Sequence, residues 1–345
     1  MSKMKPNWPL LAGLRFVLAV MVCLGHTAST IGDFGASYYD HFSGFASVGV
    51  FFLVSGYCMA HSYTGEPAGF FRRRFWRIAP VYWAGCLVAL SPFWIFGGNL
   101  AVSFDAGYRT PSFRTFLPIL LGLGPMVRMN GVIFDVALWS VCVECAFYLA
   151  VPLINRLPDW GLIVVMALSL ALTAVRFDYL GPNLYGQTLW LFCLGYLLYR
   201  RPDSRVVQVL AFALPTLGMI PAVLRGWSTG ADLFAPEIAL GGACILVFGR
   251  NWQLPERMQG PALYLGDLSY PLYICFWPVA WLIFFDDQMP VILKQTPFAL
   301  VAQLAVAAVI LHAVDRPLRR FGREPKFRGG RSRRGLVPEP VGDGG

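Results

Sequence analysis

The chain has 345 residues, a formal net charge of +9 and a mean hydropathy of +0.57. Apolar residues make up 57% of it and charged residues only 14%, whereas a soluble domain has about a quarter charged residues. A soluble fold of this length has too little interior to bury so much apolar surface. The composition therefore excludes an ordinary soluble protein and predicts an all-α integral membrane protein.

Apolar stretches of the length that a helix needs to cross about 30 Å of hydrocarbon recur along the chain. We expect about ten transmembrane helices, near residues 8–29, 44–61, 78–97, 138–155, 160–176, 184–200, 206–224, 231–250, 263–285 and 295–314. A further apolar stretch at 116–127 is too short to span the bilayer. We expect it to be re-entrant or interfacial.

An even number of spans places both termini on the same side of the membrane. With that side cytoplasmic, 21 of the 28 Lys and Arg residues lie in inner segments and six in outer ones, with Arg15 inside the first span. This bias predicts cytoplasmic termini, although it falls to 12 against six without the C-terminal tail. We expect a polytopic membrane domain over 1–317. A basic, disordered cytoplasmic tail over 318–345 would contact anionic lipid and not nucleic acid.

The eight cysteines give no sign of a disulfide framework, because nearly all lie within predicted spans among small and apolar residues. Cys142 and Cys145 form a CxxC pair, but no second pair and no nearby histidine accompanies them, so we expect no metal site. Walker, Rossmann and HExxH patterns are absent from the sequence. We find no internal repeat of the kind that marks a transporter built from two halves.

Ionisable residues inside predicted spans are functional candidates, because a charge in the bilayer is costly. Arg15 and His26 are separated by eleven residues, which turn a helix through about 1100° and advance it by about 16 Å. The two side chains therefore lie on one helix face. A lone histidine near a span end is commonly a packing residue. Its alignment with Arg15 makes His26 a candidate general base and Arg15 a candidate substrate- or cofactor-binding residue.

Glu144 is a second ionisable residue in a predicted span, about 9 Å from the outer end of its helix. His26 should lie at a similar or slightly shallower depth. We therefore predict that Glu144 and His26 share one cavity, as an orienting carboxylate and a general base. The spacing is equally compatible with a structural ion pair between Glu144 and Arg15.

A cluster of arginines, Arg72, Arg73, Arg74 and Arg77, precedes the third span at its cytoplasmic end. The positive-inside rule explains part of this charge. Arg74 and Arg77 also share a face near a helix N-terminus, where backbone N–H groups and forked guanidinium groups suit phosphates. The cluster is explained about equally well as a topogenic signal and as a site for a phosphorylated cytoplasmic cofactor.

Six segments resemble, in order, the conserved segments of the acyltransferase 3 family, whose members O-acylate polysaccharides, lipopolysaccharide and related glycans. They cover about residues 10–320 and read LAGLRFVLAVMVCLGH, VGVFFLVSGY, RRFWRIAPVYW, LWSVCVECAFYLAVP, LSYPLYICFWPV and DRPLRRF. Two positions depart from the pattern: Phe276 stands where many members have His, and Asp315 where many have Glu. A mechanism that needs the second histidine is therefore not supported, and His26 carries more of the argument.

The resemblance implies a multi-pass O-acyltransferase of the bacterial inner membrane. It would move an acyl group, usually acetyl, from cytoplasmic acyl-coenzyme A to a hydroxyl of a cell-surface or envelope glycan or lipid-linked saccharide. Arg74 and Arg77 would bind the phosphates of the coenzyme. A neutral His26 would deprotonate the acceptor hydroxyl, or would itself be acylated first; we prefer direct attack.

Three hydroxyl groups near these positions are further candidates, those of Ser55, Tyr57 and Tyr148. They would donate hydrogen bonds to the developing oxyanion or to the acceptor, or else join helices to one another. Because no appended extracytoplasmic domain is evident, either this domain or a separate extracytoplasmic partner protein would complete the transfer. The alternatives are a glycan transporter or flippase without acyl transfer and a non-enzymatic assembly factor. Neither needs a thioester.

Overall fold

The computed structural model describes residues 6–31, 44–96, 99–100, 108–109, 113–123, 137–175, 183–224, 235–285 and 296–322. Within these segments the protein is helical, apart from the antiparallel pair of two-residue strands β1 (Asn99–Leu100) and β2 (Tyr108–Arg109). The all-α class that the composition predicts is confirmed.

The helices follow the apolar segments of the sequence. Their bounds are α1 (Trp8–Ile31), α3 (Gly44–Gly65), α4 (Phe70–Phe96), α5 (Phe113–Leu120), α6 (Leu138–Arg156), α7 (Asp159–Val175), α8 (Asn183–Arg200), α9 (Arg205–Leu224), α10 (Ala235–Val247), η2 (Gly249–Asn251), α11 (Glu256–Phe285), α12 (Thr296–Ile310), η4 (Leu311–Asp315), α13 (Arg316–Arg319) and η5 (Arg320–Gly322). Each predicted span overlaps at least one of them. In the described part of the chain, four stretches are long and apolar enough to cross a membrane: Trp8–Thr27, Gly44–Gly65, Leu138–Arg156 and Thr296–Gly322.

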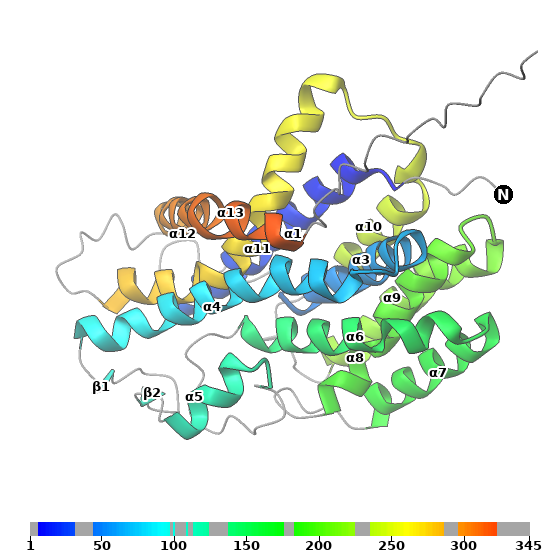
Figure 1. Ribbon diagram of the computed structural model, residues 1–345. Coiled ribbons are helices and arrows are strands. Elements are labelled where there is room, and N and C mark those ends of the chain that lie inside the picture. Colours follow the sequence, from blue (N-terminus) through cyan, green and yellow to red (C-terminus); the bar gives the residue numbers. More distant parts are fainter. Residues whose placement is uncertain are drawn as a thin grey trace, which may run out of the picture.

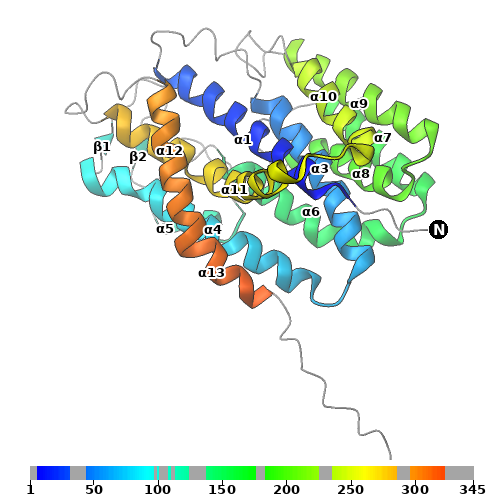
Figure 2. The same ribbon diagram turned by 90° about the horizontal axis from the view of Figure 1, so that it is seen from above.

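The long helices pack side by side in a bundle (Figures 1 and 2), in which α1 packs most extensively on α11, and α3 on α8. The contact between α3 and α8 is a close approach of backbones. A Cβ added to Gly56 would lie 1.9 Å from the carbonyl oxygen of Phe192, and one added to Gly195 would lie 1.9 Å from that of Leu53. Glycine at these positions lets the two helices pack directly on one another, as in other membrane bundles.

Large apolar side chains remain exposed on the outside of the bundle. Leu149 on α6 is 70% exposed and Trp160 on α7 is 71% exposed. In water such a surface would be unfavourable, whereas hydrocarbon solvates it without cost. The bundle is therefore built to face lipid.

Helix α11 changes direction along its length (Figure 1), and it contains Pro261, Pro271 and Pro278. Proline lacks the N–H that would continue the hydrogen-bond ladder, and its ring clashes with the preceding turn, so a helix bends there. The bend is important because α11 packs against both α1 and α4.

Helix α5 covers the first part of the 116–127 segment and is only eight residues long, too short to cross a bilayer. It is attached to α4: Tyr82 OH donates to the carbonyl oxygen of Ile119 at 2.5 Å, and Trp83 Nε1 donates to that of Leu120 at 3.1 Å. Residues 124–127 lie outside the described residues.

The segment predicted as a C-terminal tail begins, at residues 318–322, with the end of α13 and with η5. These residues pack on the bundle, because the ring of Phe321 lies 5.3 Å from that of Trp76 on α4. Residues 323–345 lie outside the described residues.

Candidate active site

A partly open cavity of about 530 Å³ is lined by residues of α1, α3, α4, α6 and α11 and of the segment after η4. Its lining residues on α3 extend from Val48 to Gly65, which is about 25 Å of helix at 1.5 Å per residue. The cavity is therefore elongated and follows α3 along most of its length.

The two ends of the cavity differ in chemistry. Near Gly65 and along the middle, the lining is rich in charge, with five arginines and two carboxylates. These are Arg15, Arg73, Arg74, Arg77, Arg319, Glu66 and Glu144. The Val48 end is apolar and aromatic, with two hydroxyl groups. Its lining residues are Val48, Phe51, Phe52, Val141, Ser140 and Tyr273.

Glu144 is hydrogen-bonded in the middle of the cavity. Ser55 Oγ on α3 and Tyr148 OH on α6 each donate to Glu144 Oε1 at 2.5 Å, and the two hydroxyl oxygens are 3.0 Å apart. Tyr148 lies one turn after Glu144 on the same helix, so its position follows from helical geometry. The contact with Ser55 instead joins two helices that are distant in sequence. The structure thus brings together three predicted site residues.

Arg74 and Arg15 line the same cavity without a carboxylate partner among the described residues. The Nε atom of Arg74 is buried and has no hydrogen-bond partner, and its guanidinium lies 6.0 Å from the centre of the Phe70 ring. No hydrogen bond or ion pair links Arg15 to Glu144 in the described part of the chain. Both side chains are partly buried, and the Glu144 carboxylate lines the same cavity without forming an ion pair with either of them. A guanidinium that makes no direct ion pair in such a site can bind an anionic ligand.

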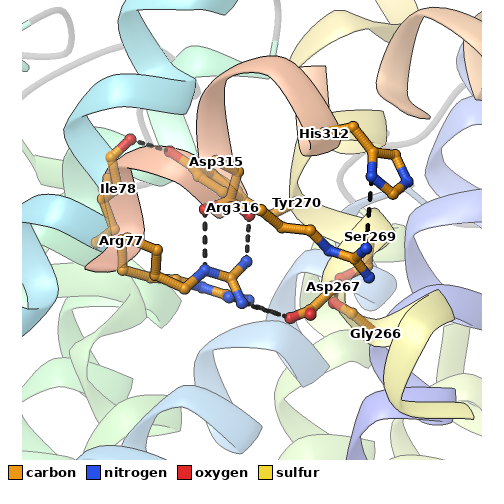
Figure 3. A network of polar contacts seen from close by, with 10 residues as sticks. Arg77, Ile78, Gly266, Asp267, Ser269, Tyr270, His312, Asp315 and Arg316 are labelled. Carbon is orange, nitrogen blue, oxygen red and sulfur yellow. Dashed lines mark hydrogen bonds and ion pairs between the residues drawn. The ribbon is translucent and has the colours of Figure 1, made fainter. Parts of the chain in front are cut away.

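Arg77, in contrast, belongs to an ion network at the wall of the cavity (Figure 3). Its NH1 group donates to Asp267 Oδ1 on α11 at 3.2 Å, and Arg319 donates to the same oxygen at 2.7 Å. Arg319 also pairs with Asp315, which is 0% exposed, through Nε and NH2. The network joins α4, α11 and α13. Arg77 therefore has a structural partner that Arg74 lacks.

His26 lies just outside the apolar end of this cavity. A Cβ added to Gly44 would be 3.2 Å from His26 Nε2, and Gly44 precedes the cavity residue Val48 by about one helical turn. The His26 ring stacks on Phe276 with centroids 5.7 Å apart, and it meets the edge of Trp277 at 5.8 Å. Phe276 is therefore in direct contact with His26.

The structure does not bring His26 and Glu144 together. On α3, Gly44 marks the level of His26 and Ser55 marks the level of Glu144. These two positions are separated by about 16 Å along the helix. Glu144 therefore does not orient the imidazole by direct contact.

Tyr57 is also outside the cavity. It is 5% exposed, and its ring meets the edge of Tyr199 on α8 at 5.5 Å. Its place is between two helices, away from the Ser55 side of α3.

Several lining residues were missed by the sequence analysis. His61 lines the cavity near its charged end, where its Nδ1 is 3.2 Å from Tyr199 OH and its ring is 5.2 Å from that of Trp8. Ser62 follows Ser55 by two helical turns, so helical periodicity could have found this stripe. Tyr273 lies within one of the segments that resemble the family, but it was not predicted as a site residue. The sequence around it does not indicate which face of α11 it occupies.

The apolar bundle, with a cavity lined by both charged and apolar side chains, is that of a multi-pass membrane protein with a site among its helices. A family model for an acyltransferase domain matches residues 9–314. The chain therefore belongs to the acyltransferase 3 family, and it is a membrane acyltransferase.

One curated relative is "Putative membrane-bound transacylase BcsY" of Komagataeibacter xylinus. The two chains are 25% identical over 302 aligned positions, which cover 77% of this chain and 71% of that protein. No solved structure matches the chain.

Proposed function

We propose that the protein is an O-acyltransferase that moves an acyl group, acetyl foremost, from cytoplasmic acyl-coenzyme A to a hydroxyl of a cell-surface or envelope glycan. The observation that carries this proposal is the chemical gradient along the cavity. Guanidinium groups that form no ion pair among the described residues lie in its charged part, and its apolar end stops one helical turn from His26. Acyl-coenzyme A has the matching gradient, with phosphates at one end and an uncharged arm that ends in the thioester.

In this proposal the arginines hold the phosphates of the donor. Arg74 and Arg15 bind them most directly because neither forms an ion pair with a carboxylate in the described part of the chain, and Arg77 contributes the N–H groups that Asp267 leaves free. The Glu144 carboxylate accepts hydrogen bonds from the amide groups of the arm as it passes Ser55. It also balances part of the positive charge of the cavity.

The transfer itself takes place at the apolar end. The acceptor hydroxyl oxygen attacks the thioester carbonyl carbon while neutral His26 takes the hydroxyl proton. The C–O bond forms, the C–S bond breaks, and the proton passes from His26 to the leaving thiolate. Phe276 stacks on His26, and its ring lies beside that of Tyr273 at the apolar end of the cavity. Turnover therefore requires the Phe276 ring to turn aside so that the imidazole can reach the thioester.

The distribution of Lys and Arg supports a topology of about ten spans with both termini cytoplasmic, in the inner membrane of a bacterium. Arg74 then lies at the cytoplasmic side, where acyl-coenzyme A is made, and His26 at the outer side, where the glycan is. A separate extracytoplasmic protein could receive or present the glycan. Fusing a topology reporter after Gly65 and after Arg156 tests this arrangement, because both sites are expected to report a cytoplasmic location.

Donor binding and glycan acylation together test the function. The full-length protein in detergent is titrated with acetyl-coenzyme A, and saturable binding is expected. Cell-surface glycan acetylation is then compared between a deletion strain and strains complemented with wild type or with His26→Ala, and only wild type should restore it. Absence of binding, with loss of glycan export in the deletion strain, would instead identify a transporter or flippase.

A further inference from the structure

We infer that Phe51 and Tyr273 narrow the apolar end of the cavity and thereby restrict the enzyme to short acyl groups. This inference rests on the proposed function, because it assumes that the thioester lies at the end opposite the arginines. It goes further by naming the two side chains that exclude longer acyl groups.

The first support is the position of the two rings. Phe51 lies on α3 one turn beyond Val48, and Tyr273 lies on α11, which faces α3 across the cavity. Their ring centroids are 5.7 Å apart and their planes are inclined by 65°, an edge-to-face contact. Both side chains line the cavity. An acyl group that extends from the arginine-rich part toward His26 therefore meets this pair of rings.

The second support is that Tyr273 is held in place. Its hydroxyl oxygen is 2.7 Å from Ser140 Oγ on α6. A serine hydroxyl has only one proton to donate. Ser140 donates that proton to the carbonyl oxygen of Ala137 at 3.0 Å. Tyr273 is therefore the donor in its hydrogen bond with Ser140. Tyr273 is 7% exposed and Ser140 is 5% exposed. The ring is thus fixed by a buried hydrogen bond as well as by packing.

The third support is the packing behind Tyr273. Its ring lies 6.2 Å from that of Phe276, which is 0% exposed and stacks on His26. An acetyl group adds one methyl beyond the thioester carbonyl. A longer chain would have to displace Tyr273 into Phe276, in an interior packed at close to crystal density. Each added methylene is therefore expected to lower affinity.

The test measures the dissociation constants of acetyl-, butyryl- and hexanoyl-coenzyme A for the full-length protein in detergent by isothermal titration. Hexanoyl-coenzyme A is expected to bind at least about ten-fold more weakly than acetyl-coenzyme A. Ten-fold is about the lower limit of the discrimination that a single extra methylene produces in an apolar pocket. Phe51→Ala is expected to reduce that ratio to about three-fold or less. Phe212→Ala is the control, because Phe212 packs on Phe248, away from the cavity, and should keep the wild-type ratio.

A second variant covers the case in which Phe51→Ala does not fold. Tyr273→Phe keeps the ring and removes only the bond to Ser140, so it is expected to relax the ratio part of the way. Equal affinities of the wild-type protein for the three donors would overturn the inference. It would also be overturned if folded Phe51→Ala and Tyr273→Phe proteins kept the wild-type ratio of the hexanoyl- and acetyl-coenzyme A dissociation constants. If neither acyl-coenzyme A nor free coenzyme A binds at all, the proposed function fails; if free coenzyme A binds but chain length has no effect, only the inference fails.

Discussion

Arg74 provides the sharpest test of the donor site, because the structure separates its role from that of its neighbours. Its buried Nε atom has no hydrogen-bond partner, and no carboxylate contacts it among the described residues. Replacing Arg74 with Ala therefore leaves no protein group without a partner. We expect the variant to fold as stably as wild type, or more stably, because the cost of a buried guanidinium is removed.

The expected loss is in donor affinity. A hydrogen bond between a charged group and its partner contributes about 1.5 to 3 kcal/mol. Since every 1.4 kcal/mol corresponds to a factor of ten in an equilibrium constant, Arg74→Ala should raise the dissociation constant of acetyl-coenzyme A by about ten- to 150-fold. Arg74→Lys should recover only part of this loss, because an ammonium group lacks the fork that binds a phosphate with two N–H groups.

Isothermal titration of the purified variants measures this effect, and a thermal unfolding scan measures stability in parallel. Arg72→Ala is the matched control, because Arg72 precedes α4's cavity residues on the same helix but is exposed and outside the cavity. It removes the same positive charge from the start of α4. Wild-type affinity in Arg74→Ala would show that the arginines serve membrane topology alone. Equal losses of affinity in Arg72→Ala and Arg74→Ala would show that the summed positive charge attracts the donor and that Arg74 makes no specific contact with it.

Three further predictions concern the base, the carboxylate and the packing of the bundle. His26→Ala should abolish acyl transfer and leave donor affinity within about three-fold of wild type. His312→Gln should be tolerated, because that side chain is exposed, lies beside Tyr264 and Arg316, and does not line the cavity. Glu144→Gln keeps an oxygen that can accept the hydrogen bonds from Ser55 and Tyr148, so the thermal stability should not change. The rate of acyl transfer should fall at least about ten-fold because the negative charge is lost. Gly195→Ala should destabilise the protein by about 1 to 3 kcal/mol in thermal unfolding, because its Cβ would lie 1.9 Å from a backbone oxygen of α3, whereas Gly13→Ala meets nothing within 4 Å and should be neutral.

Each of these three has an outcome that contradicts it. Acetylation close to wild type in His26→Ala would remove the base from the mechanism. An unstable Glu144→Gln protein would assign that carboxylate a structural role, and a stable variant with full activity would assign it none. A Gly195→Ala protein that unfolds at the wild-type temperature would mean that α3 and α8 can separate without cost.

Helix positions could be predicted from the sequence because they depend on local properties. A run of apolar residues of spanning length favours a helix in lipid whatever its neighbours are, since the backbone must satisfy its own hydrogen bonds. Each predicted span therefore overlaps a helix of the structure. Arg15, Ser55 and Glu144 were likewise found locally, because polar side chains in such runs are costly and conspicuous.

The relative depth of these residues was decided by tertiary structure alone. Counting residues from each span end placed His26 and Glu144 at similar depths, yet α3 shows that they lie about 16 Å apart along its axis. The offset between helices is set by packing, such as the close approach at Gly56 and Gly195. That packing depends on pairs of side chains and cannot be derived from one helix.

The difference between Arg74 and Arg77 has the same origin. In the sequence they are three residues apart in one basic cluster, with the same expected roles. In the structure, Arg77 meets Asp267, which is 190 residues away, whereas no carboxylate among the described residues reaches Arg74. The local sequence determined which positions of the membrane domain carry a charge, because the free-energy cost of placing a charged side chain there arises at each residue separately. Only the folded chain decided which of those charges is neutralised, because neutralisation requires a partner from a distant helix.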